Sequence, residues 1–301
     1  MEYSSVPAVH WLSPTPLTFT AYPALKDPGD MQWGYQNQRW FTAAGAIGRL
    51  NGDGSVSKFA VPGGGSPMFL SRAAGGKGGF WFTLPKKNAI GRVFEDGTFG
   101  PLIDCGNKAQ PAAITGGPYR SYAAAFGRPE IYELTGDDEV REIGTDLYGV
   151  EALADTTGGD WLWCFAKGEL VRISTEDGRR GNHYTLPEGA AVERMIRHPS
   201  GEVFYVDIGR RVIGRIKDEF TIVEYRLQPG MTPLDLCAGG GNTVWFPVSG
   251  RASICRMEDD GVLEYPLTGV ADFHLHRIMF DLENLWCSES AGKRIGYAKA
   301  P

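Results

Sequence analysis

The stretch Trp81-Phe82-Thr83, with Ile90-Gly91-Arg92 and Asp96-Gly97 downstream of it, is one unit of a repeat that runs through the whole chain. Its aromatic position recurs with a constant spacing of 41 residues. The seven aromatic residues in this column are Trp40, Trp81, Tyr122, Trp163, Phe204, Trp245 and Trp286. A period of about 40 residues with short apolar runs is typical of propeller blades, each built from about four strands.

A second column follows the aromatic one, and it usually has the sequence Ile-Gly-Arg. It begins seven or nine residues after each aromatic, at Ile47, Ile90, Ile131, Leu170, Ile213, Ile254 and Ile295. Asp-Gly turn pairs follow in several repeats, and no long segment has the period of an amphipathic helix. Short β-branched and aromatic runs bounded by turn residues indicate strands. The sequence therefore predicts an all-β fold, a seven-bladed β-propeller with four-stranded blades.

The last repeat is too short for four strands. After Trp286 only 15 residues remain, enough for the Ile295 segment but not for another strand. An open sheet edge is an aggregation hazard. We therefore expect the N-terminal stretch, residues 9–19, to supply the missing strand. The chain is predicted to form a single domain over residues 1–301, with residues 1–20 as the closing region.

Composition narrows the function classes. The net charge is −6 and no long basic block occurs, so nucleic acid is not an expected partner. No apolar run of roughly 18 residues and no signal peptide is found, so no membrane association is expected. The five cysteines are odd in number and lack metal-site spacing, which favours a reducing cytoplasm. We expect a cytoplasmic monomer without an organic cofactor.

Ionisable residues gather at one predicted end of the last three blades. Strands alternate in direction, so the start of the first strand and the end of the second open on the same face, which we call the mouth end. Ten residues before the aromatic stand Arg194, Asp235 and His276, and three residues after it stand Asp207 and Glu289. Pockets with a few convergent polar groups are the usual binding sites. The predicted substrate-binding residues at these positions are Arg194, Asp207 and Asp235, together with Asp30 of the first blade.

The densest group is His274-Leu275-His276, with Glu289 on the neighbouring predicted strand. Residues two apart on a strand share a face, so both imidazoles point the same way. Two imidazoles and a carboxylate can act as a general base with an orienting partner. The same groups can bind a divalent metal. A hydrated rim without any chemistry is the third interpretation.

The recurrent units resemble the virginiamycin B lyases, also called streptogramin lyases. The units that carry the resemblance are Trp-Phe-Thr, Ile-Gly-Arg, Asp-Gly and Glu-Tyr-Pro-Leu, the last at residues 264–267. The resemblance covers essentially the whole chain. It implies a seven-bladed β-propeller that is closed by its N-terminal strand, in agreement with the repeat count.

The resemblance also implies a chemistry. The family opens cyclic depsipeptide antibiotics by elimination, in which a base removes the α-proton beside an ester carbonyl and Mg²⁺ near carboxylates polarises that carbonyl. The family's catalytic histidine falls on His276, and Glu289 is the nearest match to its last-blade glutamate. His274 stands where the family has another glutamate. Leu234 stands where the family has a second histidine, and we assign it to the substrate-binding set.

These positions give the predicted roles. His276, Glu289 and His274 are the predicted catalytic residues. Mg²⁺ keeps most of its waters and needs few protein oxygens, so Glu289 and Asp207 are its predicted ligands.

The expected function is lyase-like proton abstraction and elimination on an ester, lactone or related natural product. The substrate is a small molecule or cyclic peptide, and the changed positions argue against classical streptogramin cleavage. One alternative is a natural-product tailoring cyclase or isomerase on the same fold. Another is a non-catalytic propeller that binds a ligand or protein. A calcium-dependent lactonase is disfavoured, because the mouth positions contain no Asn.

Overall fold

The computed structural model describes residues 2–74, 78–116, 120–136, 138–259, 261–269, 274–289 and 293–301. Nearly all regular structure in these ranges is short β-strand, and the helical part is one 3-10 turn, η1 (Pro85–Lys87). None of the helices within these ranges is long and apolar enough to cross a membrane. The chain divides into two compact units: a first unit of Met1–Gly29 with Gly189–Pro301, and a second unit of Asp30–Glu188.

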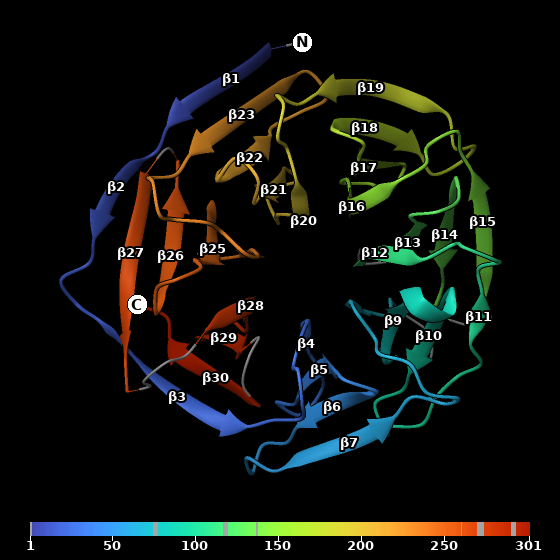
Figure 1. The fold of residues 1–301 in the computed structure, drawn as a ribbon, viewed down its shortest axis with the longest axis horizontal. Helices are drawn as coiled ribbons and strands as arrows, with labels where there is room; N and C mark the ends of the chain where they lie inside the picture. Colours follow the sequence, from blue (N-terminus) through green and yellow to red (C-terminus); the bar gives the residue numbers. More distant parts are fainter. Residues whose placement is uncertain are drawn as a thin grey trace. The chain divides into compact units, whose positions relative to one another are not determined.

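The second unit contains four antiparallel sheets of four strands, each formed by consecutive strands (Figure 1). The first two sheets are β4 (Met31–Trp33), β5 (Arg39–Ala43), β6 (Ala46–Leu50), β7 (Val56–Ala60), and β8 (Leu70–Arg72), β9 (Phe80–Leu84), β10 (Ala89–Val93), β11 (Ile103–Asp104). The next two are β12 (Pro111–Gly116), β13 (Ser121–Ala125), β14 (Glu130–Leu134), β15 (Val140–Gly144), and β16 (Val150–Asp155), β17 (Trp161–Ala166), β18 (Glu169–Ser174), β19 (Arg180–Thr185).

The first unit contains the remaining three repeats. Their strands are β20 (Val192–Arg197), β21 (Val203–Asp207), β22 (Val212–Ile216), β23 (Thr221–Arg226); β24 (Cys237–Ala238), β25 (Thr243–Pro247), β26 (Ser253–Glu258), β27 (Gly261–Thr268); and β28 (Leu275–Phe280), β29 (Asn284–Glu289), β30 (Arg294–Lys299). The last repeat supplies only three strands, as its length predicts.

The N-terminal segment completes the last sheet and extends the other two sheets of the first unit. β3 (Leu17–Pro23) pairs antiparallel with β30, so the expected closure by an N-terminal strand is confirmed. At Leu17 and Thr18 it also pairs parallel with β27, which joins the last two repeats into one nine-stranded sheet; below, the strands of each repeat are called one sheet. The closing strand lies at residues 17–23, and the expected range of 9–19 was too early. The preceding residues form two further strands, β1 (Glu2–Pro7) and β2 (Val9–Leu12). They pair parallel with β23 and β27 as fifth strands, which the repeat pattern did not predict.

The two sequence columns meet as cross-strand pairs. Trp81 stands opposite Arg92, and Phe204 stands opposite Arg215. In each pair the guanidinium carbon lies over the ring, 5.0 Å from its centroid for Trp81 and 5.6 Å for Phe204. Trp40 with Arg49 and Trp245 with Arg256 repeat the arrangement. Cation–π contact between directly opposed residues explains why the two columns recur together.

The glycine of the second column leaves room for a ring. A Cβ on Gly91 would lie 2.2 Å from the Phe82 ring, and one on Gly214 would lie 1.9 Å from the Tyr205 ring. Phe82 stands directly opposite Gly91, and Tyr205 opposite Gly214. The aromatic side chain therefore lies flat over the facing strand, where a side chain would displace it.

Gly91→Ala is expected to lower the free energy of unfolding by about 1–3 kcal/mol, because overpacking forces the Phe82 ring out of place. Gly144→Ala is the matched control, since Gly144 also lies in a strand but its Cβ would meet no atom within 4 Å. The control should change stability by less than about 0.5 kcal/mol. Urea unfolding of both variants measures the difference, and equal stabilities would contradict the packing argument.

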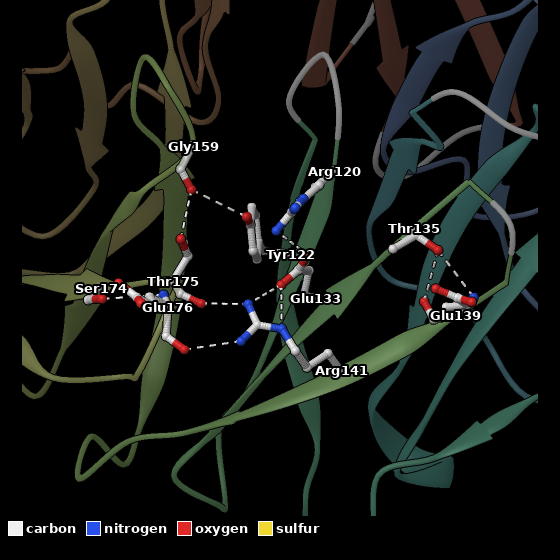
Figure 2. A network of polar contacts seen from close by, with 10 residues as sticks. All are labelled: Arg120, Tyr122, Glu133, Thr135, Glu139, Arg141, Gly159, Ser174, Thr175 and Glu176. Carbon is white, nitrogen blue, oxygen red and sulfur yellow. Dashed lines mark hydrogen bonds and ion pairs between the residues drawn. The ribbon is translucent and has the colours of Figure 1, made fainter.

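Charged residues in the second unit tie neighbouring sheets together (Figure 2). Glu133 on β14 is buried and forms ion pairs with Arg120 and Arg141. Arg141 also donates hydrogen bonds to the backbone carbonyls of Thr175, at 2.6 Å, and Glu176, at 3.1 Å, in the turn after β18. A buried carboxylate needs such partners. The charged groups of this network therefore have a structural role, which is to hold two neighbouring sheets together.

Candidate functional site

The predicted mouth end exists within each sheet of the first unit. At this end Val192 on β20 pairs with Asp207 on β21, and Leu275 on β28 pairs with Glu289 on β29. An isolated bridge between Pro233 and Val248 marks the same end of the middle sheet. The starts of first strands and the ends of second strands thus lie together in all three sheets, as the alternation of strand direction predicts.

Two β-bulges interrupt the strands at this end. In β20 the register shifts between Val192 and Arg194, and in β28 it shifts between Leu275 and Ile278. His276 lies inside the second bulge and its side chain is partly buried, whereas His274 precedes the strand and is exposed. Bulges re-aim side chains and are over-represented next to active sites. The bulge therefore gives His276 a direction that the regular ladder would not.

An ion network joins the three sheets at their mouth ends. The Arg277 Nη2 donates to Glu193 Oε1 at 2.8 Å, across 84 residues of sequence. The Arg277 Nη1 lies 3.9 Å from Asp235 Oδ1, and the Arg194 Nε lies 3.6 Å from the same oxygen. Only Glu193 is substantially exposed, with 36% of its side chain accessible. Two predicted residues, Arg194 and Asp235, are thus brought together.

The two aspartates ten residues before the aromatic have the same structural task. Asp235 Oδ2 accepts a hydrogen bond from the Ile278 N–H at 2.9 Å, and Asp30 Oδ2 accepts one from the Leu70 N–H at 2.9 Å. Each acceptor lies one repeat before its donor, and both carboxylates are buried. Each aspartate thus holds the first strand of the next sheet. Asp30 belongs to the second unit.

Asp207 is held inside its own blade. Its carboxylate is fully buried and accepts hydrogen bonds from Arg210 Nε at 2.7 Å and from the Ala191 N–H at 3.0 Å. The Arg210 guanidinium also binds Glu224, which accepts a 2.7 Å hydrogen bond from the Tyr3 hydroxyl. Burial, followed by the Glu224 hydrogen bond, raises the pKa of Tyr3 to about 12. Every one of these groups serves to anchor β1 and β21.

Glu289 is bound by an arginine on the adjacent strand. Arg294 donates from Nη2 to Glu289 Oε1 at 2.7 Å and from Nε to Oε2 at 2.8 Å, a bidentate pair. The Arg294 hydrogen bonds hold the pKa of Glu289 below its ordinary value, and the backbone and charge of His274 add to this effect. Glu289 is therefore a weak base, and it ties the segment before β28 to β29.

The predicted metal ligands do not suit Mg²⁺ as they stand. Both oxygens of Glu289 face Arg294, and both oxygens of Asp207 face Arg210 or a backbone N–H. An arginine that chelates a carboxylate competes with a cation for its lone pairs. Within the described ranges, no group of three or more His, Cys, Asp or Glu side chains is arranged to hold a metal ion.

Sequence reasoning missed three residues of this end: Glu193, Arg277 and Arg294. It considered one position per strand, and a bulge puts an extra residue beside that position. Glu193 and Arg277 are the immediate neighbours of the predicted Arg194 and His276. A search for oppositely charged residues next to the mouth positions would have found both. Leu234 lies partly buried beside Asp235, with its N–H bonded to the Pro247 carbonyl at 3.1 Å, and offers an apolar side chain.

No protein-family model matches the chain, and neither does any curated protein sequence. Solved structures do. Virginiamycin B lyase from Staphylococcus aureus is similar with a TM-score of 0.82 and 22% identity, over 95% of this chain and 100% of that chain. A catalytically inactive histidine-to-alanine variant of that enzyme with quinupristin gives a TM-score of 0.80 and 23% identity, over 94% of this chain and 100% of that chain.

A third similar structure is the β-propeller domain of Cps50 (Swd1) from Myceliophteria thermophila. It matches with a TM-score of 0.77 and 12% identity, over 95% of this chain and 100% of that chain. The predicted fold class, an all-β propeller, is therefore confirmed. Identities this low establish the fold, and the same architecture carries unrelated functions. Function has to be argued from the residues of the site.

Proposed function

We propose that this protein is a lyase-like enzyme in which His276 removes a proton next to the carbonyl of an ester, lactone or related natural product. The observation that carries the proposal is the division of roles at the mouth end. Asp207, Asp235 and Glu289 each form an ion pair with an arginine, which competes with a substrate proton for their lone pairs. An imidazole has a pKa suited to proton abstraction near neutral pH. His276 is the one that a bulge directs.

The proposed reaction balances without water. The substrate needs a second carbonyl group, placed so that the alcohol carbon of the ester is β to it. His276 takes the proton from the α-carbon between them, and the electron pair of that C–H bond forms a carbon–carbon double bond to the β-carbon. The C–O bond at the β-carbon breaks, and the acyloxy group leaves as a carboxylate. A cyclic ester is opened in this way and its atoms are all retained. The imidazolium then returns its proton to solvent.

The neighbouring residues have supporting roles in this proposal. His274 is exposed and directly precedes β28, so its imidazole is available to orient a substrate. The ion pair between Glu289 and Arg294 fixes the strand beside His276. Arg194, with 15% of its side chain accessible, and the apolar Leu234 are the groups that we assign to substrate contact.

Mass spectrometry of an incubated ester distinguishes the candidate functions. Quinupristin is the first probe, because a similar structure contains it, and a panel of macrolactones and linear β-acyloxy esters extends the test. Elimination opens a ring without changing its mass, whereas hydrolysis adds one water. From a cyclic ester we expect an isomeric product that carries a new double bond, and from a linear β-acyloxy ester an unsaturated ester and a free acid. Dialysis against EDTA is expected to leave this turnover unchanged, because arginines bind both predicted metal ligands.

Other outcomes would contradict the proposal. A product heavier by one water would indicate a hydrolase. A ring-closed isomer would favour a tailoring cyclase or isomerase. Saturable binding with no conversion of any ester in the panel would favour a non-catalytic binding propeller. Loss of turnover in EDTA, restored by Mg²⁺, would mean that the arginines release the carboxylates when substrate binds.

A further inference from the structure

We propose that Arg277, Glu193 and Asp235 form an ionic clamp that fixes the direction of the His276 imidazole. Arg277 is then a positioning residue, which acts on the reaction through its neighbour in the chain. The catalytic meaning of the clamp rests on the proposed function, whereas its geometric effect on His276 does not.

The bulge takes His276 out of the regular ladder, so contacts outside that ladder must hold it in its new direction. Between Leu275 and Ile278 the regular pairing with β29 is interrupted, so the ladder does not fix the residues in between. The backbone around the bulge is fixed by side chains instead. The Arg277 N–H donates to Ser288 Oγ at 3.3 Å, and the Ile278 N–H donates to Asp235 Oδ2 at 2.9 Å. One attachment lies on β29 and the other in the neighbouring sheet.

The Arg277 side chain adds a third attachment, to yet another sheet. The side chain is only 6% accessible, and a buried guanidinium is stable only with carboxylate partners. Arg277 forms ion pairs with two carboxylates: its Nη2 lies 2.8 Å from Glu193 Oε1, and its Nη1 lies 3.9 Å from Asp235 Oδ1. Glu193 lies in the bulge of β20, so one ion pair connects the two bulges of the mouth end. The planar fork of arginine suits such a bridge, whereas lysine offers a single point of charge.

A clamp of this kind matters for proton transfer because the base must be within about half an ångström of its productive position. A misplacement of about 1 Å costs about 10²-fold in rate, even when the altered residue does not touch the substrate. Three sheets contribute to the clamp, so the position of His276 depends on how they are held together rather than on its own strand.

Glu193→Gln tests the clamp without removing a buried group. The change keeps the shape of the side chain, removes its charge, and affects a residue that is 36% accessible, so the protein is expected to fold. Histidine labelled with ¹³C at Cε1 gives one signal for each of the five histidines, and single His→Gln substitutions assign them. We expect the His276 signal to shift and broaden in Glu193→Gln, while the His198 signal stays in place.

Glu202→Gln is the reciprocal control. Glu202, like Glu193, forms an ion pair with an arginine, but its partner Arg215 lies in the same β20–β23 sheet, at 2.8 Å. Glu202 also accepts a hydrogen bond from the Ser200 hydroxyl, which is itself hydrogen-bonded to His198. This variant should move the His198 signal and leave the His276 signal unchanged. The pair of variants thus separates a local effect on His276 from a general loosening of the sheet, which would move both signals in both variants.

Arg277→Lys provides the second test. Lysine keeps the charge but cannot bridge two carboxylates, so the His276 signal should change as in Glu193→Gln. For an ester that the protein converts, kcat should fall about 10–100-fold while KM stays within about twofold. An unchanged His276 signal in both variants would contradict the clamp proposal, even if His276→Ala abolished turnover. A changed signal combined with full turnover in His276→Ala would support the clamp and contradict the proposed function.

Discussion

Replacing His276 by alanine is expected to lower turnover about 10²–10⁴-fold, the usual contribution of a positioned general base. The physical reason is that the acids of the mouth end cannot take over its task. Arg294 holds the pKa of Glu289 below its ordinary value, so this carboxylate has little tendency to accept a proton near neutral pH. The imidazole of His276 is partly buried and contributes little to the core, so the free energy of unfolding should change by about 1 kcal/mol or less.

Two other histidines provide matched controls for this variant. His183 is exposed on β19 of the second unit, so His183→Ala should change neither turnover nor stability. His198 is buried and bonded to Ser200 and to the Thr243 carbonyl, so His198→Ala should lower stability and leave the turnover of the folded protein intact. Initial rates on a converted ester, together with a urea unfolding curve for each variant, measure the contrast. Full activity in His276→Ala would rule out His276 as the base and contradict the proposed function.

The periodic features of the fold were predictable because each depends on contacts that recur in every blade. Trp81 and Arg92 recur as a pair since they face each other across two strands, and Gly91 recurs since the Phe82 ring covers it. The count of repeats and the short last repeat then required a strand from the N-terminus. Local spacing in the sequence was sufficient to predict the repeat, the blade count and closure by an N-terminal strand, but not the position of that strand, which is residues 17–23 rather than 9–19.

The chemistry of the mouth end was only partly predictable. The sequence placed Arg194, Asp235 and His276 at one end of their strands, and the structure agrees. The sequence did not show that one oxygen of Asp235 accepts a hydrogen bond from the Ile278 N–H, or that Arg277 forms an ion pair with Glu193. Those contacts depend on bulges, each of which adds a residue to a strand without changing the 41-residue spacing of the aromatic column. They also connect residues of different sheets, whose side chains can be matched only once the blades are packed.

The parallel strands β1 and β2 illustrate the same limit. Their sequence has no counterpart in the repeat, and they pair only with the outermost strands of two finished sheets. Their polar side chains nevertheless find equivalent partners. The Tyr3 hydroxyl binds Glu224, and the His10 Nε2 lies 3.1 Å from Glu264, the corresponding carboxylate of the next sheet. The N-terminal segment thus lacks the repeat in its own sequence, but it contacts equivalent glutamates in two successive repeats.

Deleting residues 2–23 is expected to abolish soluble folding, whereas deleting residues 2–12 should only weaken the fold. The longer deletion removes β3, whose Leu17 and Phe19 are buried in the core of the last sheet. Burial of each such side chain contributes about 1.5–3 kcal/mol. The deletion also leaves the backbone of β30 unpaired at a sheet edge, which favours aggregation. The shorter deletion removes β1 and β2 but leaves the strands of all three repeats in place, together with the pairing of β3 with β30 and β27.

Thermal melting and light scattering of the two deletions test this difference. In the shorter deletion, Glu224 keeps its hydrogen bonds to Arg210 and Tyr205, so a single cooperative transition at a reduced melting temperature is expected. The longer deletion should scatter light before it melts. If both deletions melted like the full chain, β3 would not close the last sheet in solution. If both aggregated equally, the outer strands β1 and β2 would be as necessary as β3, because the edges of β23 and β27 would then be the exposed templates.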